Sequence, residues 1–136
     1  PSVCIERRRA EYQLTQEVQS FGTVDIVFET SRYGIYLLNI APGKTIDLHM
    51  HREMEEHELV MSDGLLLQGE PVLAGMAHAW PKEFAHGYHN PTDGARSILC
   101  IDRPKFIPDD EIPVTSEPGS LSEVRADFFY PREQAS

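Results

Sequence analysis

The histidines are the residues whose type and spacing first indicate chemistry. All six lie between His49 and His89, and one residue separates His49 from His51. Side chains at positions i and i+2 of a β-strand share a face, so both imidazoles can converge on one point. Neutral imidazole binds zinc, iron, nickel and copper, and an added carboxylate extends the range to manganese. The competing interpretation is that the pair faces solvent on an edge strand.

A cluster of glutamates follows this pair. Four of them, at positions 53, 55, 56 and 58, surround His57. A carboxylate placed after a turn can complete a facial ligand set with open positions, which a catalytic metal requires. We interpret most of the cluster as a solvated acidic turn and one glutamate as a ligand. His57 is an alternative fourth ligand.

A third candidate ligand, His86, lies in a stretch that runs from Gly75 through Pro81 to Asn90. Aromatic and small residues flank this histidine. Taken alone, His86 is better interpreted as a hydrogen-bonded or exposed histidine than as a ligand. Its spacing from the glycine, the proline and the asparagine is what makes it informative.

The two stretches together resemble the two motifs of the cupin superfamily. Residues 43–63 match G-x5-H-x-H-x(3,4)-E-x6-G, and residues 75–90 match G-x5-P-x-G-x2-H-x3-N, in the right order. The sequence departs from the motifs at Asp63 and Glu83, which each stand where the motif has glycine. Because a turn with positive φ tolerates aspartate, we expect the turn at Asp63 to survive. Glu83 leaves the conformation of the loop before His86 open.

The resemblance implies a jelly-roll barrel, or double-stranded β-helix, that holds one divalent metal ion. It implies four metal ligands: His49, His51, Glu56 and His86. Glu55 is the alternative carboxylate because the motif allows both spacings, although the six-residue interval to the turn favours Glu56. Zinc, iron, manganese and nickel are all compatible with this ligand set.

The elements that would position these residues are predicted to be β-strands. Residues 24–28 and 46–50 alternate between apolar and polar, as half-buried strands do. Apolar runs at 35–40, 59–61, 77–80 and 98–101 end at turn signals, and residues 65–73 predict a hairpin. We expect one all-β domain over 1–136, with its barrel at 21–106 and a proline-rich tail at 107–136. Ser120 and Glu123 predict a short helix in that tail, ending near Tyr130.

Counting by twos from His86 directs Tyr88 and Phe84 into the barrel. Tyr88 and His78 are the acid–base candidates, with His89 as a further one. The substrate-binding candidates are Tyr36, Trp80, Phe84 and Met61. For each of these residues, ordinary core packing is the more usual explanation than contact with a substrate. Three cations could hold an anionic substrate or simply be solvated: Arg32, Lys44 and Arg103.

The strand of the histidine pair also indicates a partner. If the pair faces inward, strict alternation directs Asp47 inward and Ile46, Leu48 and Met50 outward. An apolar outer face must be covered, so we expect a homodimer. The alternative is that the N-terminal segment or the tail covers this face within one chain.

Composition excludes several function classes. The chain has 22 acidic and 12 basic residues, giving a formal charge of −10. This charge argues against nucleic acid and anionic membrane surfaces as partners. No apolar run approaches the roughly 18–20 residues that span a bilayer, and we expect a cytoplasmic protein. Two cysteines give no disulfide framework.

Three functions fit these observations. The first is a metal-dependent enzyme that acts on a small oxygenated substrate by Lewis-acid chemistry, as an isomerase, epimerase, cyclase or lyase. The second is an iron-dependent dioxygenase on a similar scaffold. The third is a non-catalytic cupin that binds a small molecule, although a pure binder does not need an open metal.

Overall fold

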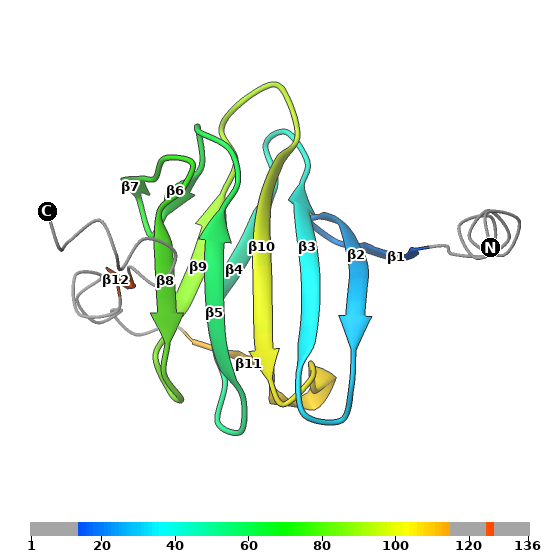
Figure 1. The fold of residues 1–136 in the computed structure, drawn as a ribbon. Helices are drawn as coiled ribbons and strands as arrows, with labels where there is room; N and C mark the ends of the chain where they lie inside the picture. Colours follow the sequence, from blue (N-terminus) through cyan, green and yellow to red (C-terminus); the bar gives the residue numbers. More distant parts are fainter. Residues whose placement is uncertain (1–13, 115–124, 127–136) are drawn as a thin grey trace, which may run out of the picture.

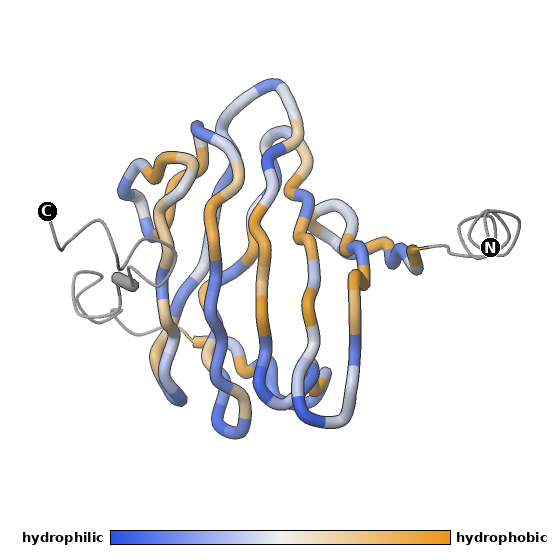
Figure 2. The backbone as a smooth tube through the Cα atoms, viewed as in Figure 1, coloured by the Kyte–Doolittle hydropathy of each residue, from blue (hydrophilic) through white to orange (hydrophobic). Residues whose placement is uncertain are grey.

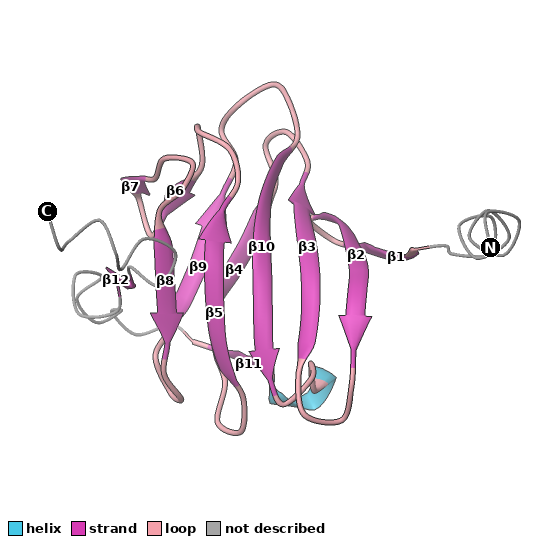
Figure 3. Cartoon of the chain, viewed as in Figure 1, coloured by secondary structure: helices cyan, strands magenta, loops and turns pink. Residues whose placement is uncertain are grey.

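A computed structural model describes residues 14–114 and 125–126 of the chain, and they form two antiparallel sheets that face each other (Figures 1 and 3). The first sheet has the order β1-β2-β3-β10-β5-β8-β12, and the second has β11-β4-β9-β6-β7. This architecture confirms the expected jelly-roll. The strands are β1 Thr15–Gln19, β2 Gly22–Glu29, β3 Gly34–Ile40, β4 Thr45–Met50, β5 Glu55–Val60, β6 Leu66–Leu67, β7 Glu70–Pro71, β8 Ala77–Trp80, β9 His86–His89, β10 Arg96–Arg103, β11 Ile112–Pro113 and β12 Arg125–Ala126.

The apolar core lies between the two sheets. Ile98 of β10 faces Leu38 of β3 on one side and Val60 of β5 on the other, which fixes the register of the three central strands. Figure 2 shows hydrophobic stretches on β3 and β10 and a hydrophilic lower half of β5. Burial of each aliphatic side chain stabilises the fold by about 1.5–3 kcal/mol. The main buried cluster comprises Ile40, Ile46, Val60, Leu65, Leu67, Val72, Trp80, Tyr88 and Ile98.

Strand β4 corrects the expectation of strict alternation. The pairing of β4 with β9 shifts between Ile46 and His49, which marks a β-bulge. A bulge inserts an extra residue and reverses the phase of the side chains. Ile46 is therefore buried in the core and Asp47 is exposed, the reverse of the prediction, while His49 still faces inward.

The two departures from the motifs have different outcomes. Positive φ belongs to Gly64, at 108°, rather than to Asp63, whose carboxylate instead accepts a hydrogen bond from the Ala74 N–H. Glu83 itself adopts φ 66°, the left-handed conformation that glycine takes at little cost. The backbone N–H of Glu83 donates to the carbonyl of His51 at 2.6 Å. The loop before His86 therefore keeps the expected backbone shape without glycine.

The first part of the tail packs on the barrel. A 3₁₀ turn, η1 (Pro108–Asp110), leads into β11, which pairs with β4. The helix predicted from Ser120 to Tyr130 lies mostly outside the described residues. At Arg125–Ala126 that prediction is wrong, since these residues form β12 and pair with β8. Within the described part of the chain, no helix is long or apolar enough to cross a membrane.

Candidate metal centre and cavity

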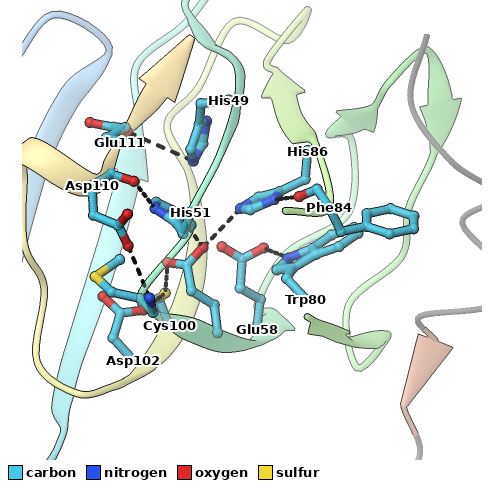
Figure 4. A network of polar contacts seen from close by, with 12 residues as sticks. His49, His51, Glu58, Trp80, Phe84, His86, Cys100, Asp102, Asp110 and Glu111 are labelled. Atoms are coloured by element: carbon cyan, nitrogen blue, oxygen red, sulfur yellow. Dashed lines mark hydrogen bonds and ion pairs between the residues drawn. The ribbon is translucent and has the colours of Figure 1, made fainter. Parts of the chain in front are cut away.

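Three strands bring four candidate ligands together at one end of the barrel. His49 and His51 lie at the end of β4 and just beyond it, Glu56 begins the inward face of β5, and His86 opens β9. One donor atom from each of these four residues lies within 4.8 Å of the others. Figure 4 shows the three imidazoles gathered around a common centre. All four residues are buried or nearly so.

The backbone determines which ring nitrogen of each histidine faces this centre. The Nδ1 atoms of His49, His51 and His86 lie 2.7, 2.9 and 3.0 Å from the carbonyl oxygens of Asp47, Asp110 and Phe84. A carbonyl oxygen can only accept, so each Nδ1 carries the proton and donates. The three Nε2 atoms are therefore the nitrogens that can bind a metal, which is the usual arrangement of metal-ligating histidines.

The carboxylate of Glu56 completes the donor set. Its Oε1 lies 2.9 Å from Nε2 of His51 and 2.8 Å from Nε2 of His86. Nε2 of His51 is buried without a well-aligned hydrogen-bond partner among the described residues, so it is oriented for a ligand at the centre. Three nitrogens and one carboxylate suit zinc, iron, manganese or nickel. The residues present therefore fit a divalent metal.

The electrostatics of the four residues are uneven. Burial and the neighbouring His86 lower the pKa of His49 to about 4. Burial alone would also lower the pKa of His51, but the adjacent Glu56 carboxylate outweighs it and raises the pKa to about 9. Burial opposes the charge on Glu56, yet the adjacent imidazoles of His51 and His86 hold its pKa well below the usual range. Glu56 is therefore an anion wherever the histidines can hold a proton.

The alternative ligands lie on the other face of β5. Glu55 and His57 alternate with the inward residues Glu56 and Glu58, and neither joins the four-residue cluster. The carboxylate of Glu55 instead lies 3.7 Å from the guanidinium of Arg103. Strand alternation thus brings Glu56, rather than Glu55, to the centre.

A second buried group, which the sequence analysis did not single out, adjoins the centre. Sγ of Cys100 lies 3.2 Å from Oε2 of Glu56 and 3.0 Å from Oδ1 of Asp102. Burial and the charge of Glu56 raise the pKa of Asp102 to about 10. Ile98, Cys100 and Asp102 share the inward face of β10, so counting by twos from Ile98 was the signal that could have found this pair.

Glu58 is a further inward carboxyl that was missed. Nε1 of Trp80 and the hydroxyl of Tyr88 donate to its Oε1 at 2.6 and 2.8 Å. Burial and the charge of Glu56 raise the pKa of Glu58. Counting by twos from Glu56 along β5 would have found it.

The tail supplies two more acids. The carboxylate of Asp110 accepts hydrogen bonds at 2.9 Å from the backbone N–H groups of Arg52, Glu53 and Met54. This arrangement secures the loop between His51 and Glu56. Oε1 of Glu111 lies 3.7 Å from Nε2 of His49. No sequence motif signals that the proline-rich tail returns to this place.

A cavity of about 480 Å³ opens over the centre. All four candidate ligands line it, and so do the predicted Tyr36 and Tyr88. The hydroxyl of Tyr36 donates to Glu29 at 2.6 Å and accepts from the N–H of Phe106 at 3.0 Å. Such a volume matches pockets for small organic ligands.

Four other candidates do not line this cavity. Trp80 stacks on His86 with ring centroids 4.6 Å apart, and His78 stacks on the far side of Trp80 at 5.2 Å. Phe84 lies against Trp80 at 5.7 Å. These rings position His86 within the core. Met61 is 48% exposed, because it follows the inward Val60 at the end of β5 and faces the opposite way.

Comparison of the sequence with known proteins gives one distant relative. No family model matches the sequence. Mannose-1-phosphate guanylyltransferase of Klebsiella pneumoniae is 22% identical over 112 residues, which are 79% of this chain. The chain spans about a quarter (24%) of that relative's length.

Several solved structures share this fold at low sequence identity. A sugar phosphate isomerase of the cupin superfamily from Silicibacter pomeroyi has a TM-score of 0.59 at 22% identity, covering 67% of this chain and 71% of its own. The capsular polysaccharide assembling protein CapF of Staphylococcus aureus has a TM-score of 0.68 at 19% identity, covering 85% and 35%. Oxalate decarboxylase of Bacillus subtilis has a TM-score of 0.62 at 12% identity, covering 82% and 42%. The chain is a two-sheet jelly-roll with a buried polar centre. More particularly, it has the cupin fold that its two motifs indicated.

Proposed function

We propose that this protein is a metal-dependent enzyme that acts on a small oxygenated substrate by Lewis-acid chemistry, as an isomerase, epimerase, cyclase or lyase. One observation carries the proposal. The three Nδ1 atoms are committed to backbone carbonyls, so three Nε2 atoms and the Glu56 carboxylate converge beside a cavity. A site that only stabilised the fold would not need to open onto such a cavity.

The candidate ligands His49, His51, Glu56 and His86 would hold a divalent ion, which supplies a Lewis acid with open positions for a substrate oxygen. Glu58 is the proposed general acid–base residue, because it lines the cavity and its pKa is raised. The hydroxyl of Tyr88 is already committed to Glu58. Tyr88 therefore orients the Glu58 carboxyl rather than exchanging a proton itself.

The similar proteins support a carbohydrate-like substrate. One is named as a sugar phosphate isomerase, and another as a mannose-1-phosphate guanylyltransferase. Sugars and related hydroxycarbonyl compounds offer the paired oxygens that two open metal positions can bind. The predicted cytoplasmic location stays a prediction from the sequence.

We also propose that the protein forms a homodimer. Strand β1 is exposed along its whole length and pairs with β2 alone among the described strands. An exposed edge strand offers unpaired backbone groups to another chain. Val18 in this strand is 84% exposed, which adds an apolar contact.

The test of the enzymatic proposal compares turnover with oxygen uptake. Protein loaded separately with zinc, manganese, nickel and iron is incubated with a panel of ketoses, aldoses and hydroxy acids, followed by NMR and an oxygen electrode. We expect conversion without oxygen consumption.

Glu58→Gln should lower kcat and abolish one limb of the pH–rate profile while the metal content is unchanged. Oxygen uptake with the iron form would establish a dioxygenase, and binding without conversion would establish a binding protein.

A further inference from the structure

Among the residues that the structure describes, the lining of the cavity is partly apolar and partly polar; six of its side chains are acidic, three are histidines, and none is a lysine or arginine. The acidic side chains come from four strands and from the residue between η1 and β11, so they do not belong to a single acidic turn. They are Glu17, Glu29, Glu56, Glu58, Asp102 and Glu111. Two of these acids, Glu17 and Glu29, lie outside the candidate metal cluster, and no lysine or arginine in the described lining offsets their charge. This part of the wall therefore favours a positive or neutral group over a negative one.

The cations that the sequence offered for an anionic substrate lie elsewhere. Arg32 and Lys44 are exposed and do not line the cavity. The side chain of Arg103 is 71% exposed, and its guanidinium lies 3.7 Å from Glu55 on the outer face of β5. Apart from the metal itself, a phosphate or carboxylate that entered the cavity would therefore meet like charge and no compensating side chain, which is an arrangement that disfavours an anionic ligand.

We infer that the substrate of this site carries no phosphate or carboxylate group, and that any charged group on it is positive. The inference rests on the proposed function, because the substrate is the one that the metal centre would act on. It also separates this protein from two of its relatives, which are named for phosphorylated sugars. The shared fold positions the candidate metal centre, whereas the side chains that line the cavity determine which charge on a substrate is favoured.

Two positions on this wall carry the preference for a cation. Glu29 lies beside Tyr36, whose hydroxyl donates to Oε2 at 2.6 Å, so the carboxylate is held in place at the cavity. Glu17 comes from β1, which lies next to β2 at the edge of the sheet. Both are distant from the four candidate ligands in the chain and do not belong to the metal cluster. They are the specificity residues that an experiment can change while the centre is left intact.

The experiment uses three hydroxamates that share one metal-binding group and differ only in the tail. The protein is loaded with zinc, its metal content is measured, and the dissociation constants are determined by calorimetry. The tails are neutral (butyrohydroxamate), cationic (β-alanine hydroxamate) and anionic (succinate monohydroxamate). We expect the cationic tail to bind tightest and the anionic tail about ten-fold weaker, since the acidic side chains of the wall attract the first tail and repel the second.

Paired variants locate the effect. Glu17→Gln/Glu29→Gln should bring the ratio of the two dissociation constants towards one. Glu70→Gln/Asp93→Asn removes the same charge from exposed positions outside the cavity and should leave the ratio unchanged.

The outcomes separate this inference from the proposed function. Zinc-loaded protein that binds the anionic tail as tightly as the neutral one overturns the inference and leaves the function standing. An equal effect of both variant pairs, or no binding of any hydroxamate to loaded protein, overturns it too. Protein that takes up no metal instead refutes the proposed function.

Discussion

At the scale of single residues, the candidate centre depends on where three imidazole protons lie. Each Nδ1 donates to a backbone carbonyl, and two of these carbonyls belong to the residue two positions before the histidine itself. The conformation of the local backbone therefore determines the tautomer. No other side chain is needed to set the tautomer of these two histidines, which explains why the motif spacing alone could indicate the candidate ligands.

One residue-scale prediction concerns pH. Because Glu56 raises the pKa of His51 to about 9, the metal-free protein holds a proton on this imidazole at neutral pH. Despite its burial, the pKa of His86 is also raised by Glu56. A metal must displace the protons on these imidazoles, so the affinity should rise as pH increases, by about ten-fold per unit for each proton displaced. His49, with a pKa of about 4, releases no proton in this range. Zinc affinity measured by chelator competition from pH 6 to 9 checks this, and a constant affinity would contradict it.

Sequence patterns predicted which residues meet at the candidate centre better than they predicted the residues around it. His49, His51, Glu56 and His86 meet as the two motifs implied. Glu58, Cys100 and Asp102 were missed because acids and a thiol on a strand are usually interpreted as exposed or inert. Their positions followed the same period of two that directed Tyr88 inward. Extended along β5 from Glu56 and along β10 from Ile98, the same period places all three side chains inward.

At the scale of elements, the tail anchors the loop that separates the ligands. Asp110 accepts three backbone hydrogen bonds from residues 52–54, and its carbonyl accepts from His51. Burial would raise the pKa of Asp110, but these donors outweigh it and lower the pKa. The loop between β4 and β5 thus depends on a segment more than fifty residues away in the chain.

The corresponding prediction is that Asp110→Asn destabilises the protein by about 1–3 kcal/mol, since an amide offers one acceptor oxygen where three donors converge. The variant should also bind zinc about ten-fold more weakly, because the loop that joins His51 to Glu56 loses its anchor while the backbone carbonyl that holds His51 remains. Urea unfolding in the presence of a chelator measures the first effect, and zinc competition measures the second. Asp109→Asn, at the exposed neighbouring position, should change stability by less than about 0.5 kcal/mol. Equal effects of the two variants would refute this role for Asp110.

Element boundaries show why some of the fold could not be predicted. The main strands were indicated by apolar alternation, but the bulge in β4 reversed the directions of Ile46 and Asp47. A bulge depends on how two strands pair, and a single strand's pattern carries no signal of it. The same holds for β11 and β12, since a two-residue strand exists only through its partner.

At the scale of the whole molecule, the seven-stranded sheet ends at β1, whose residues are exposed along the whole strand. Figure 1 shows β1 extending from the edge of the sheet beyond β2. The expectation of a dimer came from an apolar outer face on β4, yet Ile46 of that face is buried in the core. The exposed edge of β1 is the better basis for the proposed dimer.

We predict that sedimentation equilibrium gives twice the 15.4 kDa chain mass. Val18→Lys, which places a charge on the edge strand, should shift the protein to the single-chain mass with an unchanged circular dichroism spectrum. Leu73→Lys, at a position that is 59% exposed outside β1, should remain dimeric. A wild-type protein that sediments as a single chain at micromolar concentration would refute the dimer.

Elemental analysis tests most directly the proposal that the four candidate ligands bind a divalent metal ion. Protein purified without added chelator should contain about one divalent metal ion per chain. The His49→Ala/His86→Ala variant, which removes two of the four donors, should contain almost none while remaining folded by circular dichroism. The same metal content in both proteins, or none in the wild type after incubation with zinc, iron, manganese and nickel, would contradict the account.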